Sequence, residues 1–171
     1  MEHYFELYEI PVSFTPDSGT VKRKFYELSR KFHPDRFAGA DEHEQQTALE
    51  QTTLNNKAFK VLSNHALTFE YILKLKGIIV DDEKFALPPA FLAEMMDLNE
   101  AISDFEDDPD NQQLKTNALA ALTGQLDQWQ AACARLQQKC EADNYSSESL
   151  TQLKEMYYRQ KYLLRIKERL V

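Results

Sequence analysis

Apolar residues recur at steps of three and four along most of this chain, which is the spacing of one face of an α-helix. The spacing is clearest in residues 122–140, where the steps alternate between four and three, as in a helix that packs along another helix. These apolar residues are Leu122, Leu126, Trp129, Cys133, Leu136 and Cys140. Residues 78–80 are the only strand-like run, and three residues cannot form a sheet. The sequence therefore predicts an all-α fold.

The N-terminal half predicts a helical hairpin. Residues 3–10 form a short apolar segment, and an amphipathic helix is expected between Pro16 and Pro34. A second helical pattern runs from about His43 to Gly77, a glycine suited to end a helix. Because a short loop joins these two helices, we expect them to pack antiparallel. The apolar stripe of the first helix comprises Val21, Phe25, Leu28 and Phe32.

The C-terminal half predicts a three-helix bundle. Acidic residues and two prolines crowd residues 77–88, which we interpret as a linker. Three helical segments with short loops follow, at about 89–106, 110–142 and 147–170. We therefore divide the chain into an N-terminal domain (1–76), the linker (77–88) and a C-terminal bundle (89–171).

Charge is distributed unevenly along the chain. The whole sequence has 20 basic and 28 acidic residues, and this net charge of −8 argues against nucleic-acid binding. Residues 22–36 carry a net charge of +4, residues 80–110 carry −10, and the last 21 residues carry +4. This polarity indicates two contact surfaces for two different partners, with solvated helix faces as the alternative. No apolar run reaches the roughly 18 residues of a membrane span, and the N-terminus lacks signal-peptide features, so we expect a cytoplasmic protein.

Nothing in the sequence marks a catalytic or metal site. Cys133 and Cys140 lie seven residues apart on one helix face, about 10.5 Å, which is too far for a disulfide. The histidines are scattered without ligand spacing, and there is no CxxC pair. His33-Pro34-Asp35 could be a base oriented by a carboxylate or a plain helix stop, but no nucleophile or phosphate loop accompanies it. We predict no enzyme activity, no metal site and no cofactor.

The surroundings of His33-Pro34-Asp35 are more informative than the tripeptide itself. The sequence FYELSRKF at residues 25–32 precedes it, YFELY stands at residues 4–8, and NKAFKVLS follows at residues 56–63. Together these segments resemble the J-domain of DnaJ-type co-chaperones, over roughly residues 1–76.

That resemblance implies docking on a seventy-kilodalton heat-shock chaperone of the HscA or DnaK class and stimulation of its ATPase. The domain itself would hydrolyse nothing. Basic side chains would steer it onto an acidic surface, and the turn would supply hydrogen bonds. The residues implied to contact the chaperone are Lys22, Arg23, Arg30, Lys31, His33, Pro34 and Asp35.

The C-terminal half is similar to that of the HscB family of iron–sulfur-assembly co-chaperones. The chain lacks the Gly/Phe-rich segment and the CxxCxGxG region of general DnaJ proteins. The sequence FLAEMMDLNE at residues 91–100 resembles the start of the family's client-binding helix. We expect a buried stripe there, which turns Met96 and its acidic neighbours outward. The stripe comprises Met95, Leu98, Ile102 and Phe105.

The resemblance implies that this outward face binds the iron–sulfur scaffold protein IscU. An exposed methionine among acids suits a basic, partly apolar partner, and the alternative is a solvated face with one stray methionine. Tyr158, or its neighbour Tyr157, would add an aromatic ring. The implied client-binding residues are Leu92, Met96, Asp97, Glu100, Asp104 and Tyr158.

Two other interpretations stay open at this point. The chain could be a J-domain co-chaperone with another client, or a helical scaffold with a fortuitous His-Pro-Asp. The N-terminal cysteine motif of the eukaryotic relatives is missing, which the resemblance associates with a bacterial form. We expect a monomer or weak dimer that binds neither nucleic acid nor membrane.

Overall fold

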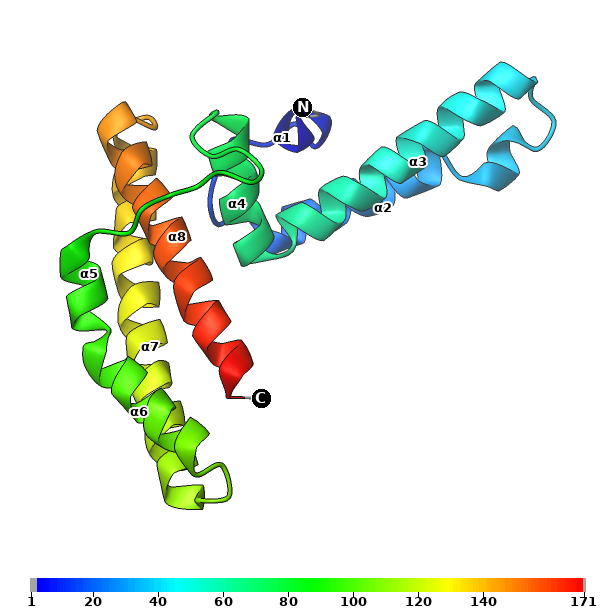
Figure 1. Ribbon diagram of the computed structural model, residues 1–171. Helices are drawn as coiled ribbons and strands as arrows, with labels where there is room; N and C mark the ends of the chain where they lie inside the picture. Colours follow the sequence, from blue (N-terminus) through cyan, green and yellow to red (C-terminus); the bar gives the residue numbers. More distant parts are fainter. Residues whose placement is uncertain (1–2, 171) are drawn as a thin grey trace. The chain divides into compact units, whose positions relative to one another are not determined.

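The computed structural model describes residues 3–170, and within this range it contains helices and connecting loops without a strand. The chain divides into two compact units, Met1–Gly77 and Ile78–Val171 (Figure 1). Gly77 ends the first unit with a φ of 69°, a left-handed conformation that glycine adopts without a Cβ clash. The all-α prediction is confirmed, as is the predicted helix stop at Gly77.

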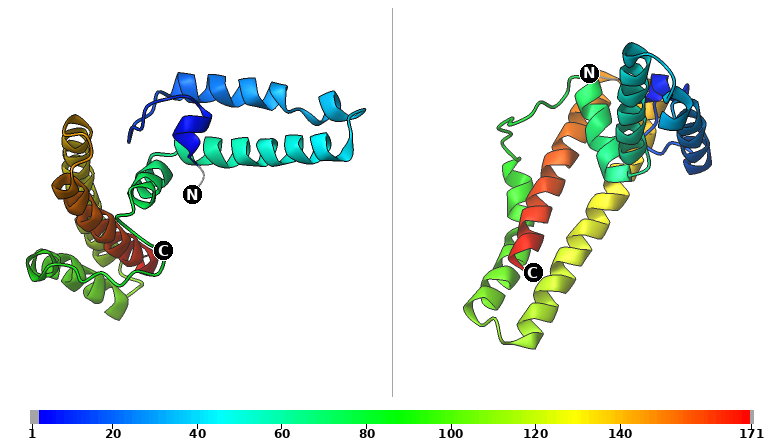
Figure 2. Two further views of the ribbon diagram at one scale, coloured as in Figure 1. Left: turned by 90° about the horizontal axis from the view of Figure 1, so that it is seen from above. Right: turned by 90° about the vertical axis from the view of Figure 1, so that its right-hand side faces the viewer.

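The first unit is built around an antiparallel hairpin of α2 and α3. The two helices lie side by side, as the views in Figure 1 and Figure 2 agree. Asp17 caps α2, because its carboxylate accepts a hydrogen bond from the Thr20 amide at 2.7 Å. The hairpin prediction is confirmed. The elements of this unit are α1 (Tyr4–Leu7), α2 (Ser18–Lys31), the short 3₁₀ helix η1 (Pro34–Phe37), α3 (Glu42–Leu62) and α4 (His65–Leu75).

The prediction of one helix from His43 to Gly77 is wrong, because the chain breaks at Ser63 and Asn64. Asn64 has an extended backbone, and its side chain accepts a hydrogen bond from the Leu67 amide at 3.1 Å. This cap starts α4 in a new direction and turns its apolar side chains inward. The residues that α4 buries are Thr68, Phe69, Tyr71, Ile72 and Leu73.

Asn55 of α3 joins three helices inside the first unit. Its side-chain oxygen accepts a hydrogen bond from the Tyr8 hydroxyl at 2.8 Å. Its amide nitrogen donates to the Phe25 carbonyl of α2 at 3.0 Å and to the Ser29 hydroxyl at 3.1 Å. Asn55 is only 1% exposed, so this polar network lies in the core. The apolar core around it includes Phe5, Phe14, Val21, Ala58, Leu62, Phe69 and Ile72.

The second unit is a helical bundle, as predicted, in which α6 and α8 both pack against α7. The predicted helix 89–106 is in fact two helices, because Met95 bends the chain between them and points into the core at 1% exposure. Residues 78–88 belong to this unit, with Ile79 buried and Leu87 against the core. The elements are α5 (Pro89–Glu94), α6 (Met96–Asp107), α7 (Gln112–Ala142) and α8 (Ser147–Arg169).

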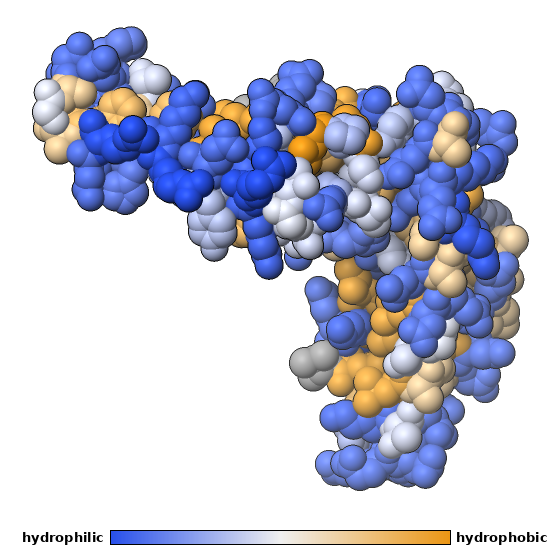
Figure 3. Space-filling model, turned by 180° about the vertical axis from the view of Figure 1, so that it is seen from behind, coloured by the Kyte–Doolittle hydropathy of each residue, from blue (hydrophilic) through white to orange (hydrophobic). Residues whose placement is uncertain are grey.

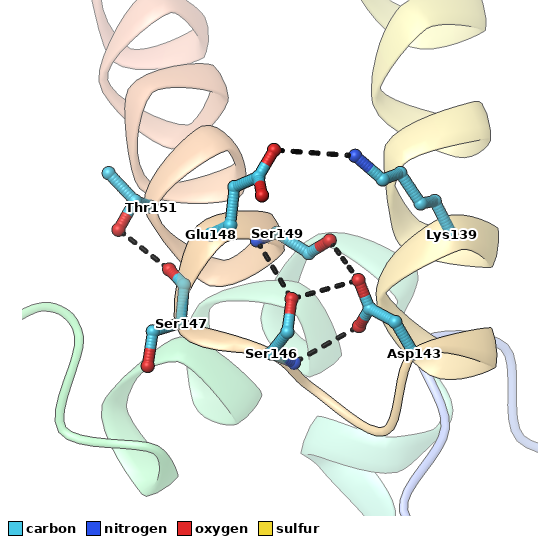
Figure 4. Close-up of polar contacts among 7 residues, drawn as sticks. All are labelled: Lys139, Asp143, Ser146, Ser147, Glu148, Ser149 and Thr151. Atoms are coloured by element: carbon cyan, nitrogen blue, oxygen red, sulfur yellow. Dashed lines mark hydrogen bonds and ion pairs between the residues drawn. The ribbon is translucent and has the colours of Figure 1, made fainter.

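The turn between α7 and α8 is closed by polar contacts (Figure 4). The Asp143 carboxylate accepts hydrogen bonds from the Ser146 amide at 3.0 Å, the Ser146 hydroxyl at 2.8 Å and the Ser149 hydroxyl. The Ser146 hydroxyl in turn accepts from the Ser149 amide at 3.2 Å and caps α8. The hydroxyl of Ser149 holds the pKa of the Asp143 carboxyl below its ordinary value.

Trp129 connects the middle of α7 to α8 through a hydrogen bond. Its indole N–H donates to the Met156 carbonyl at 2.7 Å, and its ring is half-buried against the bundle core. Further along, Arg169 forms two hydrogen bonds with Glu106, at 2.8 Å and 2.6 Å, and so ties the end of α8 to α6. The first contact fixes the register of α8 on α7, and the second fixes the end of α8 on α6.

Cys133 and Cys140 are both buried in the second unit. Within residues 3–170, no three His, Cys, Asp or Glu side chains are grouped so that they could hold a metal ion. None of the helices in the same range has the length and apolar character that a membrane span requires.

Candidate functional site

His33-Pro34-Asp35 forms an exposed turn at the end of α2. His33 has an extended backbone, and Pro34 opens the 3₁₀ helix η1. The His33 Nδ1 atom accepts a hydrogen bond from the Asp35 amide at 3.3 Å, so in neutral His33 the proton lies on the outward Nε2. The side chains of His33 and Asp35 are 56% and 90% exposed. The turn therefore presents a ring and a carboxylate to solvent.

Arg36 fixes this turn against the helix before it. Its Nη1 atom donates to the Arg30 carbonyl at 3.2 Å, across the end of α2. The arginine thus satisfies a carbonyl that the end of the helix leaves without an intrahelical partner. The sequence analysis did not single out Arg36, although a basic residue directly after the tripeptide was a visible signal.

The predicted basic residues of α2 are all at the surface. Lys22 and Arg23 lie in the first turns of the helix, and Arg30 and Lys31 lie in its last turn. From Lys22 to Arg30 the helix rises about 12 Å. Arg30 and Lys31 are close to His33 in sequence, at the end of α2, while Lys22 and Arg23 lie toward its start. Tyr26, between them, is 59% exposed.

The outward face of α5 and α6 has the composition predicted for a client site. Leu92 is 43% exposed and Met96 is 67% exposed, although Met95 between them is buried. The bend at Met95 therefore leaves both apolar side chains at the surface. Asn99 holds the bend, because its side-chain amide donates to the Met95 carbonyl at 2.9 Å and to the Tyr162 hydroxyl at 2.8 Å. The exposed acids of the face are Asp97, Glu100 and Asp104.

Tyr158 lies beside the segment that precedes α5. Its ring stacks on Phe85 with centroids 4.5 Å apart, and its hydroxyl donates to Glu83 at 3.0 Å. Glu83 also accepts from Lys154 of α8, and this hydrogen bond lowers the pKa of its carboxyl. Tyr157, the alternative aromatic residue, is only 5% exposed and belongs to the core.

The contacts of Tyr158 thus go to residues 83–85, which sequence reasoning did not connect with α8. Phe85, an aromatic residue within a polar segment, was the one signal available for this contact. Of the two tyrosines, the structure leaves Tyr158 partly accessible, and its inclusion in a client surface stays a prediction.

Comparisons with known proteins place these features in a family. Residues 87–171 match the model described as the HSCB C-terminal oligomerisation domain. The chain is 32% identical over 143 residues to the Co-chaperone protein HscB homolog of Vibrio atlanticus, covering 82% of this chain and 81% of the relative.

Two solved structures have the same fold. The chaperone HscB from Vibrio cholerae superposes with a TM-score of 0.64 at 25% identity, over 99% of this chain and 100% of that chain. Human co-chaperone protein HscB superposes with a TM-score of 0.74 over 99% of this chain and 81% of that one, and at 22% identity it supports the fold alone. On the extent and identity of the bacterial match, the chain belongs to the HscB co-chaperone family.

Proposed function

We propose that this protein is a J-domain co-chaperone that stimulates the ATPase of a seventy-kilodalton heat-shock chaperone of the HscA or DnaK class. It delivers the iron–sulfur scaffold IscU to that chaperone during cluster assembly. The observation that carries the proposal is the exposed His33-Pro34-Asp35 turn at the end of a basic helix, in a member of a co-chaperone family. Membership of that family also makes the chain a non-enzyme, as the sequence predicted.

The geometry of the turn suits docking on an acidic surface. Lys22, Arg23, Arg30 and Lys31 supply positive charge that accelerates association, since exposed charges act mainly through long-range steering. His33 then offers an outward N–H donor and Asp35 an outward acceptor, at positions that Pro34 and Arg36 hold fixed. Binding stimulates hydrolysis if the hydrolysing state of the ATPase binds these residues more tightly than its resting state does.

The face of α5 and α6 supports client binding by the second unit. Leu92 and Met96 form an apolar centre, and Asp97, Glu100 and Asp104 border it. Apolar centres of this kind carry most of the affinity in an interface, while the acids at the rim set partner choice and association rate. A basic, partly apolar scaffold surface is the complement of such a face.

The chaperone contact is tested with His33→Gln, which should abolish stimulation of a purified HscA-class ATPase in a steady-state assay. Helicity and melting temperature should stay unchanged, because the side chain is exposed and substitutions at such positions cost little stability. His43→Gln, at another exposed histidine of the first unit, is the matched control and should stimulate normally. Full stimulation by His33→Gln would refute the proposed contact.

The client contact is tested with the pair Leu92→Ala and Met96→Ala. Titration calorimetry with IscU should show binding weakened at least thirtyfold, which corresponds to about 2 kcal/mol for a hot spot. Basal ATPase stimulation should persist, since the first unit is untouched. Leu164→Ala, at a leucine of α8 that is 44% exposed, is the control. Undiminished IscU binding by the pair would exclude this face, and would favour a co-chaperone with another client or another client surface.

Two further expectations stay predictions. One is the oligomeric state, a monomer or weak dimer. The other is a cytoplasmic location, and the Vibrio relative supports the bacterial part of that expectation.

A further inference from the structure

An open apolar groove adjoins the His33-Pro34-Asp35 turn. It has a volume of about 340 Å³ and lies between η1 and the first turns of α3. Figure 3 shows apolar residues among polar ones at this free end of the hairpin. Leu49 is 59% exposed on the wall of the groove, so its side chain is accessible there. The apolar lining comprises Phe32, Pro34, Phe37, Ala38, Ala48 and Leu49.

Polar side chains that line the groove form hydrogen bonds within the first unit. The Thr52 hydroxyl donates to the Phe32 carbonyl at 3.2 Å, and the Gln45 amide donates to the Ala40 carbonyl at 3.0 Å. These bonds hold the loop wall against α3. Ala48 at the base of the groove is 4% exposed, and because it has no side chain beyond Cβ it leaves room in the groove for an incoming side chain.

We propose that the groove receives a bulky aliphatic side chain from the ATPase chaperone. Pro34 belongs both to the groove and to the proposed chaperone contact, so a partner that covers the turn also covers the groove. This inference rests on the proposed function and extends it, since the contacts assigned above, apart from Pro34, are made by charged or polar side chains. An apolar anchor enclosed by charged contacts is the arrangement in which single side chains dominate an interface.

Charge on the two sides of the groove sets the orientation of this partner surface. The α2 side is basic, with Arg30 and Lys31, whereas the first turn of α3 carries Glu42 and Glu44. The aliphatic side chain should therefore project between an acidic patch, which faces α2, and a neutral or basic patch, which faces α3.

Two variants test the groove from opposite directions. Leu49→Ser removes the apolar wall at an exposed position, and Ala38→Phe fills the groove from its exposed edge. With a purified HscA-class chaperone, each should raise the half-saturating concentration for ATPase stimulation about tenfold, with the maximal stimulation retained. Leu119→Ser, at a leucine of α7 that is 42% exposed, is the matched control and should leave the half-saturating concentration unchanged.

The outcomes separate this inference from the proposed function. Wild-type half-saturation by both groove variants, together with loss of stimulation in His33→Gln, would overturn the groove and leave the chaperone contact standing. Weakened IscU binding with normal ATPase stimulation would also overturn it, because the groove would then serve the client. No stimulation by the wild-type protein would overturn both proposals. Circular dichroism and melting verify folding, and if Leu49→Ser unfolds, Ala38→Phe alone decides.

Discussion

Asn55 shows how one buried polar residue organises the first unit. Its side chain accepts a hydrogen bond from the Tyr8 hydroxyl and donates one to the Phe25 carbonyl of α2. It therefore orients both α1 and α2 on α3. The sequence analysis predicted a helical pattern over this segment but did not single out Asn55, which is buried in α3 together with Ala58. The spacing of apolar residues predicts which positions are buried. It does not predict that a buried polar side chain such as Asn55 forms hydrogen bonds with three residues.

Replacing Asn55 with Ala should lower the free energy of unfolding of the first unit by about 2 kcal/mol. The Tyr8 hydroxyl and the Ser29 hydroxyl would lose a buried partner, and an unsatisfied buried polar group carries its full desolvation cost. Urea unfolding followed by circular dichroism measures the change. Asn56→Ala, at the exposed neighbouring position, should stay within about 0.5 kcal/mol of the wild type. Equal stability of the two variants would contradict the role assigned to Asn55.

The candidate site residues differ in how far sequence could predict them. The outward position of Arg30 and Met96 follows from helical register, and the structure agrees. The contacts of Tyr158 with Glu83 and Phe85 could not be predicted, because they join positions 75 and 73 residues apart in sequence. No local sequence pattern indicates such a pairing. The surroundings of Tyr158 can therefore be described only from the three-dimensional structure.

Among the elements, sequence predicted the helices well and their bends poorly. The apolar steps of three and four continue through Asn64 and Met95, so each pair of helices looks like one helix. At Asn64 the capping side chain was a visible signal. At Met95 there was none, because a buried methionine is compatible with a straight helix. The bend there is fixed by Asn99 and Tyr162, a contact between α6 and α8.

Ser146→Ala should destabilise the turn between α7 and α8 by about 1 kcal/mol, the usual cost of losing a helix N-cap. The Ser149 amide would lose its acceptor, and Asp143 would lose one of its donors. Ser147→Ala is the control, because only the backbone carbonyl of Ser147 accepts a hydrogen bond, from Thr151. Both are compared by urea denaturation. If Ser147→Ala lost as much stability as Ser146→Ala, the loss could not be attributed to the N-cap hydrogen bond of Ser146.

At the scale of the whole molecule, the proposed tasks are divided between two surfaces of opposite charge, one on each unit. The basic α2 and the His33-Pro34-Asp35 turn belong to the first unit, and the acidic face of α6 belongs to the second. Opposite charges attract different partners, so the scaffold and the chaperone need not compete for one surface. This division was predictable from the charge runs, whereas the packing of residues 78–88 on the bundle was not.

Acid should weaken the second unit through carboxylates that are bonded in the folded state. Hydrogen bonding to Lys154 holds the pKa of Glu83 below its ordinary value of 4.5, and Arg169 does the same for Glu106. A carboxyl with a lowered folded-state pKa stabilises the fold above its unfolded pKa, and this contribution is lost as pH falls through the folded value. Melting temperature should therefore fall as the solution is acidified below about pH 4.5.

Glu83→Gln isolates one of these contributions. The variant should melt below the wild type at pH 7, and the difference should narrow as the pH falls below about 4.5, because the wild-type carboxyl is neutralised as the pH passes through its lowered folded-state pKa. Glu168→Gln, at an exposed glutamate of α8, should follow the wild type at every pH. A constant difference between Glu83→Gln and the wild type from pH 7 to pH 3 would contradict the assignment.

Trp129, which the hydrogen bond to the Met156 carbonyl holds against α8, can serve as an intrinsic fluorescence probe of this chain. Trp129 is its single tryptophan, so intrinsic emission under selective excitation comes from one known place. The indole lines a small cavity together with Phe91 of α5 and Arg159 of α8. Movement of α5 when a client binds at Leu92 would change the polarity around the indole and hence its wavelength of maximum emission. Binding at the first unit, where no tryptophan lies, would leave the emission wavelength unchanged, so client binding and chaperone binding can be distinguished without a dye.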